Sequence, residues 1–187
     1  MTEPRKVARY SFLRAVGVVL AALGLVGCLS TDVEDPIAVE ARVDLERFMV
    51  AWYVIGNIPT PFEREAYNAL ERYELGEDGR VETTFTFRKG GFDGPEKEYH
   101  PTGFVVEDTG NAVWKMQFVW PFKADYRIVH VDDDYRYTII GRNARDYLWI
   151  MSRDPDPPEE DYARLVDLAE AQGYDPAEIR RVPQRWE

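Results

Sequence analysis

Residues 81–88 read Val-Glu-Thr-Thr-Phe-Thr-Phe-Arg, and residues 113–120 read Val-Trp-Lys-Met-Gln-Phe-Val-Trp. In both stretches, side chains of one kind occupy every second position, and one of the two sets is rich in large apolar groups. Successive side chains of a β-strand point to opposite faces of the sheet, so this alternation is typical of a strand with one buried face. The two stretches therefore predict β-strands rather than helices.

The same pattern recurs along most of the chain, and residues that favour turns, such as Asp78-Gly79 and Gly90-Gly91, separate the repeats. Eight strands are predicted, at residues 50–58, 67–75, 80–88, 97–106, 112–120, 125–131, 135–141 and 147–152. The connections have the length of hairpins, and no helical pattern lies between them. The sequence therefore predicts an all-β fold, an eight-stranded antiparallel up-and-down barrel that removes sheet edges and can hold one small ligand.

A helical pattern follows the last strand. Asp156-Pro-Pro-Glu159 resembles a capping box with proline at the first helical position, and Gly173 is a typical stop. Between them, apolar residues recur at helical spacing, at Tyr162, Leu165, Val166 and Ala169. We expect this C-terminal α-helix to pack on the barrel wall, with a partner helix as the alternative. A second short helix is expected at Asp175-Pro176.

The first residues of the chain resemble a bacterial lipoprotein leader. A basic segment precedes the uncharged, apolar residues 15–26, which are too few for a membrane span of roughly 20 residues. This run ends in Leu25-Val-Gly-Cys28, which resembles a lipobox, the site where a signal peptidase cleaves before an acylated cysteine. We expect residues 1–27 to be the signal peptide, 28–43 a lipidated tether and 44–187 the folded domain. The alternative is an ordinary secretory signal before a chance cysteine.

The residues after the lipobox, Leu29-Ser30, lack the aspartate that retains lipoproteins at the inner membrane, so the resemblance favours the outer membrane. The chain has 187 residues and a net charge of −11, so an acidic surface would be repelled by anionic lipids. We therefore expect the protein to reach the membrane through acylated Cys28. The same charge argues against nucleic-acid binding.

Residues that commonly carry chemistry are scarce. One cysteine and two histidines, His100 and His130, leave little for a disulfide or a metal site, and the acidic run Asp132–Asp134 is more typical of a solvated turn than of a calcium site. No Ser/His/Asp or Cys/His arrangement has a recognisable spacing. We expect no metal, no cofactor and no catalysis.

Several segments resemble the motifs of the lipocalin family, specifically the bacterial outer-membrane lipoprotein lipocalins, over about residues 43–183. Residues 44–53, Asp-Leu-Glu-Arg-Phe-Met-Val-Ala-Trp-Tyr, resemble the first motif, Gly-x-Trp, with Val50 in place of the glycine. Residues 57–63 resemble the first long loop of the bacterial subgroup. Residues 134–137 and 148–153 resemble the second and third motifs.

This resemblance implies that Arg153 closes the base of the barrel over Trp52. An arginine has a planar guanidinium that can stack on an indole and donate to loop carbonyls, which gives the pair a physical reason. We expect both residues to be structural. Val50 puts the tightness of the first turn in question, because glycine tolerates backbone geometry that valine does not.

The resemblance also implies a small hydrophobic ligand inside the barrel: a fatty acid, a lysophospholipid or a similar amphiphile, held for storage, transport or membrane maintenance. The inward-facing candidates for ligand binding are Phe85, Phe87, Trp114, Met116, Phe118, Trp120, Tyr126 and Tyr137. The alternative is that they fill a solid core, and a register error of one residue would reverse every face.

Two other functions stay open at this stage. One is an enzyme that modifies a lipid or isoprenoid on the same barrel, which would need a base or nucleophile facing the cavity. The other is an envelope scaffold with a filled barrel that works through its outer surface. The oligomeric state is also open, with a homodimer among the alternatives.

Overall fold

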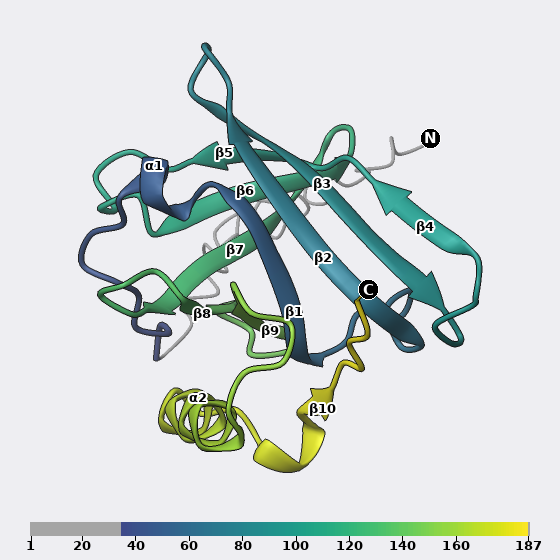
Figure 1. Cartoon of the computed structure of the whole chain (residues 1–187). Coiled ribbons are helices and arrows are strands. Elements are labelled where there is room, and N and C mark those ends of the chain that lie inside the picture. The colour runs from purple at the N-terminus through teal and green to yellow at the C-terminus, as the bar shows by residue number, and fades with distance from the viewer. Residues whose placement is uncertain (1–34, 187) are drawn as a thin grey trace, which may run out of the picture. The chain divides into compact units, whose positions relative to one another are not determined.

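The alternating stretches form one antiparallel sheet that closes on itself (Figure 1). The computed structural model describes residues 35–186. The barrel strands are β1 (Val50–Ile58), β2 (Ala66–Leu75), β3 (Arg80–Lys89), β4 (Glu96–Tyr99), β5 (Thr102–Val105), β6 (Val113–Val119), β7 (Phe122–Val131), β8 (Tyr137–Gly141) and β9 (Leu148–Ser152). Apart from β4, which pairs with β3 and not with β5, neighbours in sequence are neighbours in the sheet, and β9 pairs with β1. The predicted eight-stranded barrel is confirmed.

One predicted strand, 97–106, is split in two. β4 pairs with the second half of β3, and β5 pairs with the first half, so together they fill one place in the barrel. His100-Pro101 separates them, and proline has no backbone N–H to donate to a ladder. A second difference lies at 135–141, where β8 begins only at Tyr137. The Asp132 carboxylate accepts bonds from the backbone N–H groups of Arg136 and Tyr137, and holds the chain in a turn.

The C-terminal helix α2 (Glu159–Ala171) packs on the outside of the barrel, as predicted (Figure 1). Its buried residues Tyr162, Leu165 and Ala169 join an outer core with apolar side chains of β1, β7, β8 and β9. The helix approaches β1 so closely that a Cβ on Gly56 would lie 2.8 Å from the Tyr162 hydroxyl oxygen. Any larger residue at position 56 would therefore force the Tyr162 side chain to shift.

The start of α2 differs from the expected capping box. Pro158 is the N-cap and makes no side-chain cap bond, so the helix begins at Glu159. The short helix η1 (Pro176–Glu178) forms as predicted, and the Asp175 carboxylate caps it by accepting a bond from the N–H of Ala177. The chain then forms β10 (Arg180–Arg181), which pairs with β1.

The segment before β1 packs on the barrel earlier than expected. Ile37 and Val43 are buried, and the backbone N–H of Glu40 donates to the carbonyl of Ile128. Residues 36–43, which we assigned to the tether, are therefore part of the packed domain. The short helix α1 (Leu45–Phe48) follows them. The predicted signal peptide and Cys28 lie outside the described residues. Within residues 35–186, no helix has the length and apolar character needed to span a membrane.

Candidate functional site

One end of the barrel is closed by Arg153. Its guanidinium carbon lies 3.5 Å from the centre of the Trp52 ring. Its Nη1 donates to the carbonyl of Ala51 at 2.7 Å, its Nη2 donates to the carbonyls of Arg47, Phe48 and Met49, and its Nε donates to the carbonyl of Tyr135. Burial lowers the pKa of Arg153 to about 10, so it remains charged at neutral pH. One side chain thus joins three segments of chain.

The half of the barrel next to this end is solid. Four buried rings, those of Phe48, Trp52, Tyr73 and Trp114, contact one another with centroids 5.3–5.8 Å apart. The indole Nε1 of Trp52 donates to the carbonyl of Phe48. Trp114 was predicted to bind ligand, but it is fully buried in this cluster.

The other half of the interior holds a cavity of about 220 Å³. Strands β2, β3, β6, β7 and β9 form its walls, and the loops after β1 and β8 contribute to its lining. Aromatic and aliphatic side chains dominate, as expected for a site that takes an apolar ligand. The lining consists of Thr60, Pro61, Phe62, Glu63, Glu71, Thr83, Phe85, Pro101, Met116, Phe118, Ala124, Asp125, Tyr126, Arg142, Tyr147 and Trp149.

Four of the eight residues predicted to bind ligand line this cavity: Phe85, Met116, Phe118 and Tyr126. Phe118 is about half exposed, whereas the other three are buried. Phe87 faces the interior but is buried against the ring of Tyr99, with 6.1 Å between centroids. One half of the interior is therefore filled and the other half is open. The sequence left open a solid core or a ligand cavity, and each description applies to one half.

Tyr137 and Trp120 do not face the cavity, which corrects the sequence-based expectation. Tyr137 lies on the outer face of β8, where its hydroxyl donates to the Asp161 carboxylate of α2 at 2.9 Å. All five residues of β8 are buried, because α2 covers its outer face, so apolar character does not identify the inward side. Trp120 lies in the turn after β6 and is 82% exposed. The β6–β7 pairing shifts register before this turn.

The sequence analysis missed a buried carboxyl group, that of Glu71. It lies on β2 between Trp52 and Phe85 in the sheet register and lines the cavity. Its Oε2 has no hydrogen-bond partner among the described residues, and neither has Oγ1 of Thr83, also in the lining. Burial, reinforced by the charge of Glu63, raises the pKa of Glu71 to about 8. Ala69 and Tyr73 are apolar residues at alternate positions on either side of Glu71, and this pattern could have indicated that Glu71 faces the interior.

A second buried carboxyl group, that of Glu63, comes from the loop after β1. It accepts hydrogen bonds from the Thr60 hydroxyl at 2.8 Å and from the Trp149 indole at 2.9 Å. Burial raises its pKa despite these bonds, which favour the charged form. The lining contains no His, Cys, Ser or Lys, and residues 35–186 contain no cluster of three or more His, Cys, Asp or Glu placed to hold a metal.

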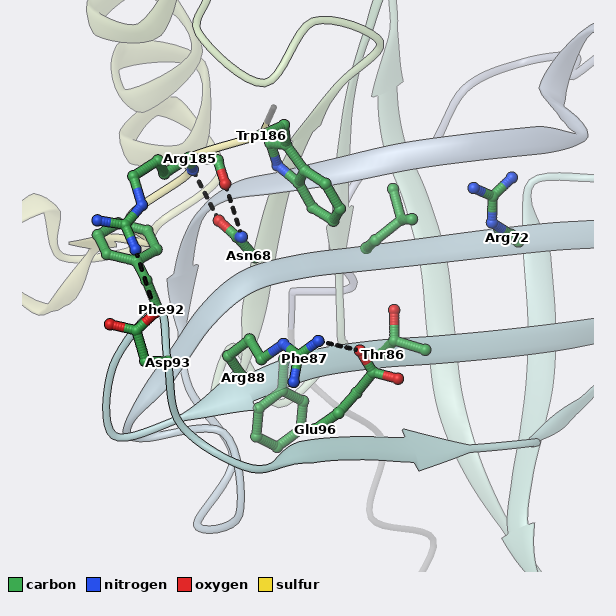
Figure 2. Close-up of a pocket in the computed structure, with 11 residues that line it drawn as sticks. Asn68, Arg72, Thr86, Phe87, Arg88, Phe92, Asp93, Glu96, Arg185 and Trp186 are labelled. Carbon is green, nitrogen blue, oxygen red and sulfur yellow. Dashed lines mark hydrogen bonds and ion pairs between the residues drawn. The ribbon is translucent and has the colours of Figure 1, made fainter.

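A larger hollow, of about 670 Å³, lies outside the barrel, between β2, β3 and the C-terminal segment (Figure 2). Most of its charged groups are paired, Arg88 with Glu96 at 3.0 Å and Arg185 with Asp93 at 3.6 Å, and Arg72 also lines it. Asn68 also bonds the backbone of Arg185. This hollow is shallow and polar, so the barrel cavity is the better candidate for an apolar ligand.

Comparison with known proteins agrees with this architecture. Residues 43–184 match the family model described as a lipocalin-like domain. The chain is 30% identical to temperature-induced lipocalin-1 of Arabidopsis thaliana over 154 residues, which cover 76% of this chain and 80% of that protein. It is 27% identical to the outer membrane lipoprotein Blc of Escherichia coli K12 over 175 residues, 92% of this chain and 97% of that one.

Solved structures share the fold at lower identity. Insecticyanin from the tobacco hornworm Manduca sexta superposes with a TM-score of 0.63 at 14% identity, over 82% of this chain and 85% of that one. Lobster apocrustacyanin A1 gives a TM-score of 0.62 at 12% identity, over 81% and 92% of the two chains. The family model covers most of the chain and the barrel has the matching topology, so this chain belongs to the lipocalin family.

Proposed function

We propose that this protein is an outer-membrane lipoprotein that binds a fatty acid, a lysophospholipid or a similar amphiphile in its barrel, for storage, transport or membrane maintenance. The observation that carries the proposal is the cavity of about 220 Å³ with apolar walls in one half of the barrel. The proposed anchor is an acylated Cys28. The name of the Escherichia coli relative, an outer membrane lipoprotein, supports the location.

The size of the cavity sets how much an acyl chain can contribute. With roughly 30 Å³ for a water-sized group, the cavity holds on the order of seven such groups. Burying about seven methylenes at ~0.8 kcal/mol each gives roughly 6 kcal/mol before the cost of association, which is about 4–15 kcal/mol. Apolar burial inside the cavity alone is therefore too weak for tight binding. Contacts at the mouth, where Phe62 and Phe118 are partly exposed, and polar groups within must add to it.

Ligand uptake is tested on the full-length chain carrying Cys28→Ser, so that the only lipid is the added probe. We expect native mass spectrometry to show one acyl or lysophospholipid probe per chain. Ala124 lines the cavity, so Ala124→Phe should fill part of it and reduce uptake at least about tenfold. Ala163→Phe, on the exposed face of α2, is the matched control and should bind normally. Failure of the parent chain to retain any such probe would refute the proposed binding.

The anchor and location need a separate test. Native mass spectrometry of the wild-type protein from its own membranes should show a mature chain that starts at Cys28 with acyl groups attached. The same spectrum reports any retained small molecule and whether the protein is a monomer or a homodimer. If Cys28 is unmodified, or if the protein is absent from the membrane fraction, the proposed lipid anchor is refuted. The proposed ligand binding in the cavity would not be affected.

A further inference from the structure

The inner end of the cavity contains two polar atoms that the protein itself leaves without partners. Oε2 of Glu71 and Oγ1 of Thr83 make no hydrogen bond with any described residue, although their side chains are only 8% and 3% exposed. Both side chains line the cavity. Buried polar groups are nearly always hydrogen-bonded, because burial without a partner is costly. Two such atoms in one cavity indicate that a ligand group binds there.

Two carboxyl groups lie at this end of the cavity, and they become negative when they lose their protons. The carboxyls of Glu63 and Glu71 line the same space and interact with each other. No lysine lines the cavity within residues 35–186. Glu63 already accepts bonds from two donors, whereas Oε2 of Glu71 has no hydrogen-bond partner among residues 35–186. A cation placed beside Glu71 would relieve the cost of burying that carboxylate.

Aromatic side chains surround the same space. The rings of Tyr126 and Trp149 are stacked with centroids 6.3 Å apart, and Tyr126 stacks in turn on Trp114. Phe85 lies opposite Glu71 across the β2–β3 ladder. Aromatic walls attract organic cations through the negative faces of their rings, and more strongly in a desolvated site. A carboxylate within an aromatic enclosure is well suited to an ammonium group.

We propose that Glu71 and Thr83 form a subsite for a protonated amine, and that the ligand of this barrel is therefore an amphiphile with an ammonium group rather than a simple fatty acid. This inference rests on the proposed function, because it assigns a ligand class to the same cavity. The ammonium would donate to Oε2 of Glu71 and to Oγ1 of Thr83, and the aliphatic part would contact Phe85, Met116 and Phe118 on the way to the mouth.

Five other titratable groups line the cavity: Glu63, Asp125, Tyr126, Arg142 and Tyr147. Asp125 is paired with Lys115 and Arg127, so it does not compete for the ligand. Arg142 is the one cation, and its Nε has no partner, although its Nη1 is paired with Asp146. Arg142 offers the strongest argument for a carboxylate ligand, so the test compares both signs of charge directly.

The experiment is isothermal titration calorimetry of the full-length Cys28→Ser chain with three probes of equal chain length: dodecylamine, dodecanol and laurate. At about pH 8 the amine is protonated, because alkylamines have a pKa close to the ~10.4 of lysine. We expect dodecylamine to bind at least about tenfold more tightly than dodecanol, and laurate to bind least tightly. This comparison in one protein does not depend on any substitution being tolerated.

Two variants connect the preference to the subsite. Glu71→Gln keeps the shape and removes the charge, so dodecylamine should lose at least about tenfold in affinity while dodecanol changes less than about twofold. Glu74→Gln removes the same charge from an exposed position on the same strand and should leave both affinities unchanged. Between about pH 6 and pH 8, affinity for the amine should rise in the parent chain and stay flat in Glu71→Gln, since Glu71 must lose its proton to pair with the cation.

Several outcomes would overturn the inference. If laurate or dodecanol binds as tightly as dodecylamine, the ligand is not selected by positive charge. If Glu71→Gln binds dodecylamine as tightly as the parent chain does, the subsite does not include Glu71. In both cases the cavity still binds an amphiphile and the proposed function stands. If none of the three probes binds, the proposed function fails, and the inference fails with it.

Discussion

The two ends of this barrel are built from the same alternating strands but differ in whether their buried polar groups are hydrogen-bonded. At the closed end, Arg153 donates to five backbone carbonyls and stacks on Trp52, whose indole is also hydrogen-bonded. At the cavity end, Glu71 and Thr83 each have a buried polar atom without a hydrogen-bond partner among residues 35–186. The hydrogen bonds of the closed end are therefore satisfied within the protein, whereas the cavity end leaves polar atoms for the ligand that we propose.

This contrast indicates where the chain gains and loses stability. A core that is packed and fully hydrogen-bonded stabilises the fold, while unpartnered buried groups reduce its stability by roughly 1–3 kcal/mol each. Features that reduce stability, such as buried polar groups without hydrogen-bond partners, occur mostly at functional sites. Substitutions at the closed end should therefore destabilise the protein, whereas removing a polar group at the cavity end should stabilise it.

The largest effect is expected for Trp52→Ala. Trp52 is fully buried, its ring contacts that of Phe48, and the Arg153 guanidinium stacks on it, so the substitution creates a large void at the closed end. We expect the free energy of unfolding to fall by about 3–5 kcal/mol, measured by urea denaturation. Trp120→Ala is the matched control, because Trp120 is 82% exposed, and it should change stability little. Equal effects of the two substitutions would contradict the role assigned to the closed end.

Removing the guanidinium should have the next largest effect. Arg153→Met keeps much of the aliphatic length but removes the guanidinium donor from five carbonyls, of which that of Phe48 still accepts from the Trp52 indole. We expect a cost of about 2–4 kcal/mol in denaturant melts. Arg153→Lys keeps a positive charge but lacks the planar guanidinium, so its stability should lie between that of the parent chain and that of Arg153→Met. Arg80→Met removes an exposed arginine that forms an ion pair with the exposed Asp78 and lies 5.4 Å from the Phe104 ring centre, and should leave the melt nearly unchanged. A tolerated Arg153→Met would show that the bonds to these carbonyls contribute little.

The barrel could be predicted from the sequence because its signal is local. Alternation of side chains is imposed by the strand backbone, so eight strands and the helix outside them follow from the order of residues. Faces are harder to predict where both sides of a strand are buried. β8 is covered by the interior on one face and by α2 on the other, so its pattern did not show that Tyr137 points outward.

The contents of the interior depend on packing in three dimensions. The closed end fills because the rings of Phe48, Trp52, Tyr73 and Trp114 meet there, from segments far apart in the sequence. No local pattern indicates where such filling stops and the cavity begins. Glu71 was missed because its charge suggests an exposed position while its neighbours Ala69 and Tyr73 on alternate positions are buried. A charged residue is usually exposed, whereas the alternation along β2 places residue 71 inside, and the sequence alone does not show which of the two holds.

The cavity end should respond to pH through Glu71. Its pKa is near 4.5 in the unfolded chain and about 8 in the folded one, so between these values the folded protein holds a proton that the unfolded chain has released. Stability must therefore fall as pH rises through this range. Glu71→Gln lacks this penalty, so its stability advantage over the parent chain should grow from almost nothing near pH 4 to on the order of 3 kcal/mol at about pH 8.

Denaturation curves at several pH values would measure this difference. Glu74→Gln is the control, since it removes a carboxyl from the exposed face of β2 and should show no such growth. Glu63 also has a raised pKa, and it is retained in the parent chain and in both variants, so the difference between Glu71→Gln and the parent chain reports Glu71 together with its interaction with Glu63. A difference between Glu71→Gln and the parent chain that stays constant with pH would mean that Glu71 is not the group that titrates.

The smallest effect concerns a strained residue at the closed end. Val50 has a φ of 71°, in the left-handed region that β-branched residues avoid, and its side chain is 66% exposed, so it gains little from packing. It stands where the first lipocalin motif has glycine. Val50→Gly should remove strain of about 1–2 kcal/mol and add about 0.5–1 kcal/mol of unfolded-state entropy, leaving a net gain in stability of roughly 0.5–1 kcal/mol.

Val119→Gly, at an equally exposed valine for which the structure shows no positive φ, should instead lower the Tm, because glycine weakens a strand. If both substitutions lower the Tm to the same extent, the positive φ of Val50 costs nothing, and the closed end would have no strain to relieve.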